Sequence, residues 1–273
     1  MFKTADYQMS AEYLSGILNG FVPETLLILG SGLGFLADQL EDAKYIPYDD
    51  IPHFRRSTAP GHAGRLVAGI LAGKKVLAMQ GRLHLYEGYT PQEIAYPIRV
   101  ANLLGANKLI ITCACGGVNT TYKVGDITVL TDYINLGHGG PLIGFDLNGF
   151  PNRFVDMTYV FDRGYLDLAH NTASKENINL KNGVYYYMPG PEFETPAQIK
   201  AIRTLGGDLV GMSTVFEVIM ARRLNMKVTG FGLVTNMAAG ILDQPLTEEE
   251  VLVEGKKASD RFSRLLKEFI RSM

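Results

Sequence analysis

The sequence predicts an α/β protein folded as a three-layer α/β/α sandwich, and three observations lead to this prediction. Short apolar runs with the length of buried strands alternate along the chain with segments suited to helices. The clearest helical segments begin with recognisable capping residues. No Pro- or Ser-rich linker, low-complexity tract or internal repeat divides the chain, so we expect a single domain over residues 1–273.

Seven apolar runs have the length and composition of buried strands. Parallel strands covered on both faces are apolar along their whole length, so a continuous apolar run is the expected pattern. The runs cover residues 25–29, 66–70, 75–79, 108–112, 126–130, 184–188 and 227–234.

Three helix starts follow from local sequence, and one long segment shows no period. Residues 90–93 form a capping box with proline at the first helical position, and residues 195–198 repeat this pattern. Thr247 precedes three glutamates and opens a long amphipathic C-terminal helix. Residues 135–163 contain several glycines and no clean period, and we expect them to form a long surface excursion.

Charge and cysteine content exclude several classes of function. The formal net charge is −2 with both signs mixed, which gives a nucleic-acid partner no electrostatic support. The first residues lack the apolar core of a signal peptide, and no apolar run approaches membrane-spanning length. Cys113 and Cys115 are the only cysteines, too close for an unstrained bridge and too few for a zinc site. We therefore expect reduced thiols, a cytoplasmic location and no membrane partner.

The segment 80–87, which follows the apolar run 75–79, carries the most informative polar residues. If the backbone stays extended, side chains alternate between faces, so that Arg82, His84 and Tyr86 point the same way while the intervening leucines face the core. Such a polar row at the end of a buried strand is costly unless an anion or polar ligand meets it. A surface strand with an apolar underside is the alternative.

A glycine-rich turn follows the first apolar run. Glycines at 30, 32 and 34 let backbone N–H groups approach an anion, and Ser31 adds a hydroxyl donor. Phe35 and Leu36 exclude a Walker A loop, which would need Lys and Ser or Thr there. Phe35 also stands where a dinucleotide-binding fingerprint would need glycine, which weakens that alternative. A tight turn without a ligand also stays open.

A third glycine-bearing loop, residues 60–66, places His62 and Arg65 just before another apolar run. A single loop histidine often has only a structural role. Three such loops at strand edges, each rich in Ser, His or Arg donors, nevertheless suit one phosphate-sized anion.

These loops resemble those of the trimeric purine nucleoside phosphorylases, and further motifs follow in that family's order. The resemblance covers about residues 24–260. It implies a mixed central sheet with a partly closed barrel. The matching segments are 30–34, 60–66, 82–87, 116–119, 190–195, 210–215 and 234–236.

The resemblance implies a site for inorganic phosphate. Arg82 would supply a charged fork, while hydroxyls and a backbone N–H would complete the coordination of the phosphate oxygens. Glu87 would orient His84 and favour its protonated form beside the anion. The matching positions are Ser31, His62, Arg82, His84, the backbone N–H of Ala114, and Ser213.

The resemblance also implies a nucleoside site. Tyr86 and Met212 correspond to positions that hold the ribose. Glu194 would accept the N1–H of a 6-oxopurine, Asn236 would bond O6 and N7, and Phe193 would stack on the base. The implied catalytic residues are His84, Glu194 and Asn236.

Without the family pattern, these residues have ordinary explanations. Glu194 suits a helix start, where the dipole favours acids, and Asn236 suits a turn. Met212 and Phe193 suit a hydrophobic core. Their joint order within the family pattern favours the functional interpretation.

The implied reaction is phosphorolysis of 6-oxopurine ribo- or deoxyribonucleosides, such as inosine and guanosine, in purine salvage. Cleavage of the glycosidic bond gives an oxocarbenium-like sugar, which phosphate stabilises and then captures. No protein nucleophile is required, and the products are free purine and α-(deoxy)ribose 1-phosphate. Phosphate is a co-substrate, and the resemblance implies no metal or organic cofactor.

The chain departs from the family at several positions. Cys113 stands where asparagine is usual, Phe216 and Lys123 where proline is usual, and Tyr133 where histidine is common. Glu248 lies near a position where many relatives place a histidine toward the sugar 5′-hydroxyl. It could accept a bond from that hydroxyl or cap the C-terminal helix.

Two other functions stay open. A 5′-methylthioadenosine phosphorylase would share the fold and the phosphate site, but an acid would be favoured in place of Asn236 because adenine presents an N6 donor and an N7 acceptor. A non-catalytic nucleoside-binding protein would have no use for Arg82, His84 and Ser213 as a separate anion pocket.

The resemblance implies a ring of three subunits. Exposed aromatic residues in segment 135–163 would form an apolar patch of the kind that marks an interface, near the sugar site of the adjacent subunit. A loop packed onto its own chain is the alternative. The aromatic residues concerned are Phe145, Phe150, Phe154 and Tyr159.

Overall fold

The computed structural model describes residues 2–59, 61–150 and 152–273. Met1, Pro60 of the third loop and Pro151 of the irregular segment lie outside the described residues. The strands are β1 (Thr25–Leu29), β2 (Glu41–Pro47), β3 (Arg65–Leu71), β4 (Lys74–Gln80), β5 (Lys108–Gly117), β6 (Ile127–Ile134), β7 (Lys181–Tyr187), β8 (Leu209–Gly211) and β9 (Lys227–Met237).

These strands form a nine-stranded sheet in the order β2-β3-β4-β1-β5-β8-β7-β6-β9. β1 runs parallel to both β4 and β5, whereas β3 is antiparallel to its neighbours β2 and β4. β9 pairs with β6 and also with β5, so five of the strands close into a ring. The expectation of a mixed sheet with a partly closed barrel is therefore confirmed.

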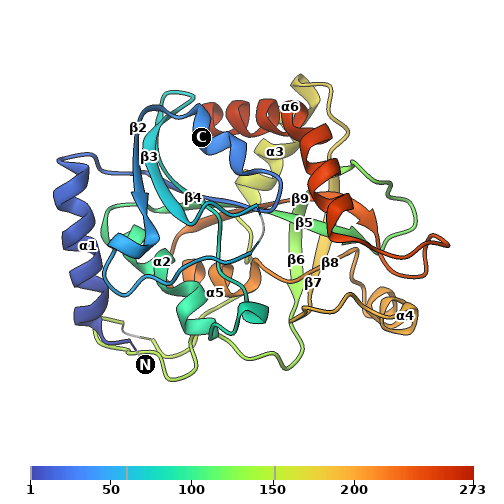
Figure 1. Ribbon diagram of the computed structural model, residues 1–273, viewed down its shortest axis with the longest axis horizontal. Coiled ribbons are helices and arrows are strands. Elements are labelled where there is room, and N and C mark those ends of the chain that lie inside the picture. The colour runs from blue at the N-terminus through green and yellow to red at the C-terminus, as the bar shows by residue number, and fades with distance from the viewer. Residues whose placement is uncertain (1, 60, 151) are drawn as a thin grey trace.

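Helices cover the sheet on both faces (Figure 1). α1, α2 and α5 pack into one hydrophobic core, while α3 and α6 pack into a second core on the opposite face. The predicted three-layer sandwich is thus confirmed. None of the described helices has an apolar stretch long enough to span a bilayer. The helices are α1 (Thr4–Leu18), α2 (Pro91–Leu103), α3 (Arg163–Lys175), α4 (Pro196–Thr204), α5 (Val215–Arg223) and α6 (Glu248–Ser272), and short 3₁₀ turns are η1 (Gly34–Gln39), η2 (Tyr48–Asp50) and η3 (Leu85–Glu87).

All seven predicted strands and the three predicted helix starts are found, with small shifts at their ends. The Thr90 and Thr195 hydroxyls accept backbone N–H bonds from the residues three positions later. The sequence did not predict α1, α3, α5, β2 or β8. β2 is an edge strand in which only Ile46 is buried, and β8 has three residues, so neither carries a strong apolar pattern.

The irregular segment is a surface excursion, as predicted, because the described residues between β6 and α3 form only turns and bends. Its aromatic residues do not all face solvent. The rings of Phe145 and Phe150 lie 5.4 Å apart, and the Arg223 guanidinium covers Phe150 at 4.5 Å. Phe154 and Tyr159 are 87% and 56% exposed. Two of the four rings therefore pack on their own chain, and only Phe154 and Tyr159 remain as exposed rings of the expected apolar patch.

Candidate active site

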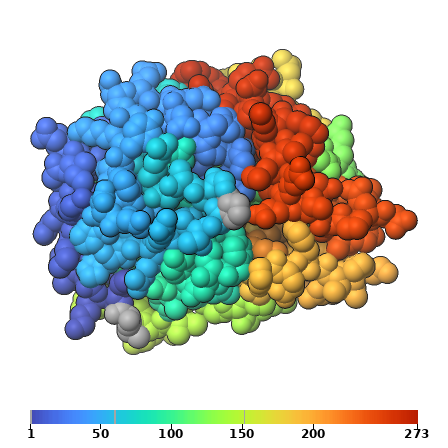
Figure 2. Space-filling model, in the orientation of Figure 1, coloured from blue at the N-terminus to red at the C-terminus, as the bar shows by residue number. Residues whose placement is uncertain are grey.

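A pocket of about 380 Å³ opens where strands β1, β4, β5 and β9 end. Crevices at the carboxyl ends of strands are where open α/β sheets bind ligands. In Figure 2 the segment after β4, the start of α6 and the segment leading to α4 surround one hollow on this face. The pocket is lined by Gly30, Ser31, Arg82, His84, Tyr86, Ala114, Cys115, Gly116, Pro191, Phe193, Glu194, Val210, Gly211, Met212, Ser213, Thr235, Asn236, Glu248 and Val251.

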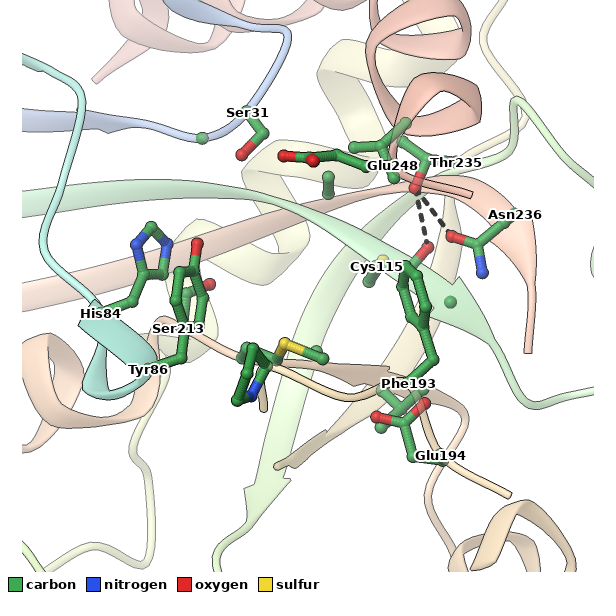
Figure 3. Close-up of a pocket in the computed structure, with 18 of the residues that line it drawn as sticks. Ser31, His84, Tyr86, Cys115, Phe193, Glu194, Ser213, Thr235, Asn236 and Glu248 are labelled. Carbon is green, nitrogen blue, oxygen red and sulfur yellow. Dashed lines mark hydrogen bonds between the residues drawn. The ribbon is translucent and has the colours of Figure 1, made fainter. Parts of the chain in front are cut away.

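The structure brings every predicted site residue except His62 to the lining of this pocket. Figure 3 shows His84, Tyr86 and Ser213 on the left of the pocket, with Ser31 above them. Glu194 and Asn236 lie on the right. The pocket therefore has an end rich in anion donors and an end with a carboxyl and a carboxamide.

Arg82, His84 and Tyr86 all line the pocket, but not through the predicted extended backbone. β4 ends at Gln80, and residues 85–87 form the 3₁₀ turn η3. The rings of His84 and Tyr86 stack at 4.6 Å with an interplanar angle of 13°. The condition of an extended backbone over residues 80–87 is therefore not met, although Arg82, His84 and Tyr86 still face one pocket.

The carboxylate of Glu87 explains why the chain turns here. It accepts the backbone N–H of His84 at 2.8 Å and lies 2.9 Å from Nδ1 of the same residue. Burial acts to raise the pKa of Glu87, but hydrogen bonds from His84 and Thr58 outweigh it and lower this pKa to about 2. Glu87 therefore stays ionised and holds the His84 ring in place.

His84 is mainly neutral at pH 7 before an anion arrives. Burial lowers its pKa, and the nearby Arg82 charge adds to this effect, while Glu87 opposes it. The contact with Glu87 is as expected and favours the protonated ring, but burial and the Arg82 charge outweigh it. The phenol of Tyr86 also stays protonated, because burial raises its pKa to about 12.

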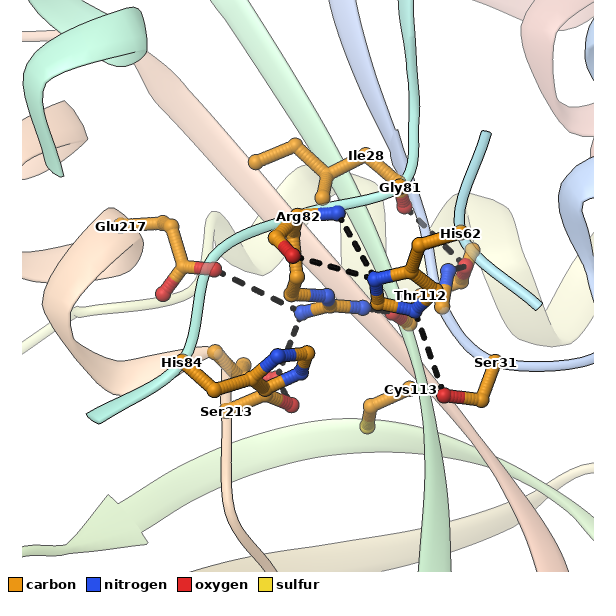
Figure 4. A network of polar contacts seen from close by, with 12 residues as sticks. Ile28, Ser31, His62, Gly81, Arg82, His84, Thr112, Cys113, Ser213 and Glu217 are labelled. Atoms are coloured by element: carbon orange, nitrogen blue, oxygen red, sulfur yellow. Dashed lines mark hydrogen bonds and ion pairs between the residues drawn. The ribbon is translucent and has the colours of Figure 1, made fainter. Parts of the chain in front are cut away.

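Arg82 is 1% exposed, and its guanidinium is held by neighbours from two elements (Figure 4). Nη2 donates to the backbone carbonyl of Thr112 on β5. Nη1 lies 3.4 Å from Thr214 Oγ1 and 3.6 Å from Glu217 Oε1 at the start of α5. Gly30 makes room for this arrangement, since a Cβ there would come within 2.9 Å of Nη2.

His62 lies behind Ser31 and does not line the pocket. Its Nε2 is 3.3 Å from Ser31 Oγ, and its Nδ1 accepts the backbone N–H of Arg82 at 3.1 Å. Burial, with the charges of His84 and Arg82, lowers the pKa of His62 to about 4. His62 is therefore neutral at pH 7, and it orients the Ser31 hydroxyl and the Arg82 backbone.

Ser213 and Thr214 lie at the start of α5, beside Arg82. The Ser213 N–H donates to the Tyr185 hydroxyl at 3.2 Å, and the Ser213 and Thr214 hydroxyls are 3.0 Å apart. Thr214 has a φ of 77°, which is uncommon for a β-branched residue and is typical of strained functional loops.

At the other end of the pocket, Glu194 is 7% exposed and burial raises the pKa of its carboxyl. Asn236 is fixed by two bonds: its Oδ1 accepts the Thr235 hydroxyl at 3.1 Å, and its Nδ2 donates to the Met237 carbonyl at 3.3 Å. Phe193 is 40% exposed, so it lies at the pocket mouth and not in a core.

Several residues of the site were not predicted. Thr235 orients Asn236, Tyr185 supports Ser213, and Glu217 faces Arg82. A single acid within an otherwise apolar helical stretch could have drawn attention to Glu217.

The described residues contain no cluster of three or more His, Cys, Asp or Glu side chains able to hold a metal ion. Cys113 and Cys115 are free and buried.

Comparison with known proteins agrees with this geometry. The family profile described as the phosphorylase superfamily matches residues 24–271. Purine nucleoside phosphorylase 1 of Geobacillus stearothermophilus is 48% identical over 251 residues, 92% of each chain. The purine nucleoside phosphorylase of Bos taurus is 43% identical over 96% of this chain and 92% of its own. Schistosoma mansoni purine nucleoside phosphorylase, solved with inosine, superposes with a TM-score of 0.93 at 35% identity over 99% of this chain and 97% of that one.

The fold, the pocket and these matches define the class of protein. The chain belongs to the phosphorylase superfamily, as a relative of the trimeric-type nucleoside phosphorylases. Its function within that superfamily is that of a purine nucleoside phosphorylase.

Proposed function

We propose that this enzyme phosphorolyses 6-oxopurine ribo- and deoxyribonucleosides, such as inosine and guanosine, to free purine and α-(deoxy)ribose 1-phosphate. The observation that carries the proposal is one pocket with anion donors at one end and Glu194 and Asn236 at the other. A non-catalytic nucleoside-binding protein would need only the second end.

Phosphate binds at the end formed by Arg82, His84, Ser31 and Ser213. Arg82 gives the charged fork, the hydroxyls add donors, and the Ala114 N–H completes the set. An anion beside His84 favours its protonated form, so phosphate binding opposes the effect of burial on that ring. His62 acts one step behind, through Ser31.

The base binds at the end formed by Glu194 and Asn236. An ionised Glu194 accepts the N1–H of a 6-oxopurine, and Asn236 bonds O6 and N7. Phe193 covers the base at the mouth, while Tyr86 and Met212 flank the ribose between the two ends.

Catalysis follows from this arrangement. The C1′–N9 bond breaks, its electron pair moves onto the purine, and the sugar becomes oxocarbenium-like. A phosphate oxygen below C1′ stabilises the cation and then bonds to it, which inverts the configuration. Asn236 stabilises the departing base at N7, a task comparable to an oxyanion hole and worth about 3 kcal/mol. Positioning phosphate against C1′ supplies much of the remainder.

Binding alone does not distinguish an enzyme that cleaves 6-oxopurine nucleosides from one that cleaves 6-aminopurine nucleosides; the rate of cleavage does. Schistosoma mansoni purine nucleoside phosphorylase has been solved with inosine and also with adenosine, and Schistosoma purine nucleoside phosphorylase with guanosine and with hypoxanthine. The Schistosoma mansoni complexes therefore include both a 6-oxo and a 6-amino purine nucleoside. In this chain Asn236 stands where a 6-aminopurine enzyme would favour an acid, which supports the 6-oxopurine class.

The proposal includes assembly and location. A cytoplasmic homotrimer acting in purine salvage accounts for the exposed rings of Phe154 and Tyr159 on the irregular segment. The two free thiols, Cys113 and Cys115, agree with a reducing compartment.

A nucleoside panel tests the proposed substrate class. Inosine, guanosine, xanthosine, their deoxy forms and adenosine are incubated with enzyme at saturating phosphate, and the products are separated. We expect hypoxanthine and guanine with the corresponding sugar 1-phosphate, and little adenine. Adenine release as fast as hypoxanthine release would contradict the 6-oxopurine assignment.

A further inference from the structure

Glu217 is a buried acid to which the reaction described above gives no role. It lies in the first turn of α5, four residues after Ser213 at the phosphate end of the pocket. Its side chain is 2% exposed, and its neighbours Val215, Phe216 and Val218 are buried and apolar. A carboxylate in such surroundings needs a compensating charge.

In the described part of the chain, that charge comes from Arg82. Glu217 Oε1 lies 3.6 Å from Arg82 Nη1, and no hydrogen bond of standard length and angle reaches either carboxylate oxygen (Figure 4). Burial raises the pKa of Glu217, while the Arg82 charge and the nearby donors of Arg82 and of the Glu217 and Thr214 backbone act to lower it. The other titratable groups that face it are the Tyr187 phenol on β7 and the Cys113 thiol on β5. A buried carboxylate with so few bonds costs folding free energy, so packing alone does not account for it.

The geometry of Arg82 shows what the carboxylate can do. The guanidinium must face an anion in the pocket although the residue is almost fully buried. The Thr112 carbonyl holds its Nη2 edge from β5, while Thr214 and Glu217 lie at its Nη1 edge from α5. A guanidinium binds an oxyanion through two parallel N–H bonds only when its plane has a defined orientation. The contacts at the Nη1 and Nη2 edges fix that orientation.

We propose that Glu217 is a positioning residue that orients the Arg82 guanidinium for phosphate through its negative charge. The inference rests on the proposed role of Arg82 in binding phosphate. Glu217 does not touch phosphate; it attracts the Nη1 edge and limits rotation of the fork. A neutral side chain of the same shape should therefore fail to replace it, and the loss should fall on phosphate and spare the nucleoside.

Glu217→Gln tests the charge because glutamine keeps the volume. The matched control is Glu176→Gln, which removes a carboxylate 3.7 Å from Arg264 on the surface. Steady-state kinetics measure kcat/KM for phosphate and KM for inosine. We expect Glu217→Gln to lower kcat/KM for phosphate about ten- to a hundredfold, as befits one charge-assisted contact, with the inosine KM within about twofold. Glu176→Gln should match the wild type, and Glu217→Asp should lie in between.

A double-mutant cycle tests whether the effect passes through Arg82. In an Arg82→Gln background, adding Glu217→Gln should change kcat/KM for phosphate by less than about twofold. The proposal is overturned if Glu217→Gln keeps the wild-type kcat/KM, or if its loss is undiminished without Arg82. Should Glu217→Gln fail to fold, Glu217→Met, which also removes the charge, takes its place, and a wild-type kcat/KM for phosphate in Glu217→Met would overturn the proposal. Wild-type turnover without phosphate would instead contradict the proposed function.

Discussion

Burial has opposite outcomes for two carboxyl groups near the pocket, and the difference defines their roles. Glu87 is surrounded by donors, which lower its pKa to about 2. Glu194 has only its own backbone N–H as a donor, so burial, with the nearby charge of Glu192, raises its pKa above the usual value. Glu87 is thus a fixed negative charge that holds His84. Glu194, which has few partners in the protein, is free to form a hydrogen bond with the purine base.

Glu194→Gln should lower inosine turnover strongly, because a neutral amide oxygen accepts the N1–H more weakly than a carboxylate does. Adenosine should be a poor substrate of the wild type, because its N1 carries a lone pair and has no hydrogen for Glu194 to accept. An unpaired polar group in a buried site can discriminate by roughly 10⁴–10⁵-fold. Values of kcat/KM for the two nucleosides check this.

The pH profile gives a second readout of Glu194. Inosine kcat/KM should fall as the pH drops through the raised pKa of Glu194, because the carboxyl loses the charge that accepts N1–H. This part of the acidic limb should be absent in Glu194→Gln. Equal kcat/KM for adenosine and inosine would reject the assignment.

Asn236→Asp should move activity toward 6-aminopurines. Aspartate cannot donate to O6, but once protonated it can give a proton to N7 of adenine. Thr235, whose hydroxyl already donates to position 236, would stay in place and limit structural change. The ratio of kcat/KM for adenosine to kcat/KM for inosine should rise. If a folded variant kept the wild-type ratio, the assignment of Asn236 to the base site would be wrong.

At the scale of elements, local signals were predictable and long-range contacts were not. The capping boxes at Thr90 and Thr195 and the apolar strands depend on neighbouring residues, so the sequence revealed them. β8 and the edge strand β2 exist because distant partners pair with them. For the same reason Glu217, remote from Arg82 in sequence, escaped notice until the fold brought the two together.

The turn after β1 provides an element-level prediction. In Gly30→Ala the added methyl group would lie 2.8 Å from the Thr112 carbonyl and 2.9 Å from Arg82 Nη2, so the guanidinium must move. We expect kcat/KM for phosphate to fall by about tenfold or more, the scale of a lost charge-assisted bond. Initial rates at limiting phosphate measure it.

Gly16→Ala is the matched control for that substitution. No atom lies within 4 Å of its added methyl group, and its site in α1 favours alanine by about 1 kcal/mol. Its phosphate kinetics should equal those of the wild type. If Gly30→Ala also had the wild-type kcat/KM for phosphate, the turn after β1 would have no part in phosphate binding.

At the scale of the whole molecule, closure of the sheet assembles the pocket. β9 pairs with β5 along its length, so Asn236 lies beside Gly116 at the same end of the sheet. β1 and β4 bring Ser31 and Arg82 to that end from the other side. The fold class was predictable from alternating elements, but this closure depends on pairings that no local pattern records.

The exposed rings of the irregular segment lead to a prediction about assembly. Phe154 is 87% exposed, the highest fraction among the exposed large apolar side chains of the described residues, and we expect a neighbouring subunit to cover it. Light scattering should give a mass near three chains of 30.0 kDa. Phe154→Asp should shift the mass toward one chain and reduce turnover, whereas Val22→Asp, at a 54% exposed site elsewhere, should do neither. A fully active monomer would contradict the trimer.

The dependence of nucleoside cleavage on phosphate tests the central claim most directly. Inosine is incubated with enzyme in phosphate-free buffer, in phosphate and in arsenate, and hypoxanthine and sugar products are followed over time. The donors at Arg82, His84 and Ser213 predict hypoxanthine release only with phosphate or arsenate, and ribose 1-phosphate as the sugar product with phosphate. Comparable release of hypoxanthine and free ribose without either anion would make the protein a hydrolase and contradict the account.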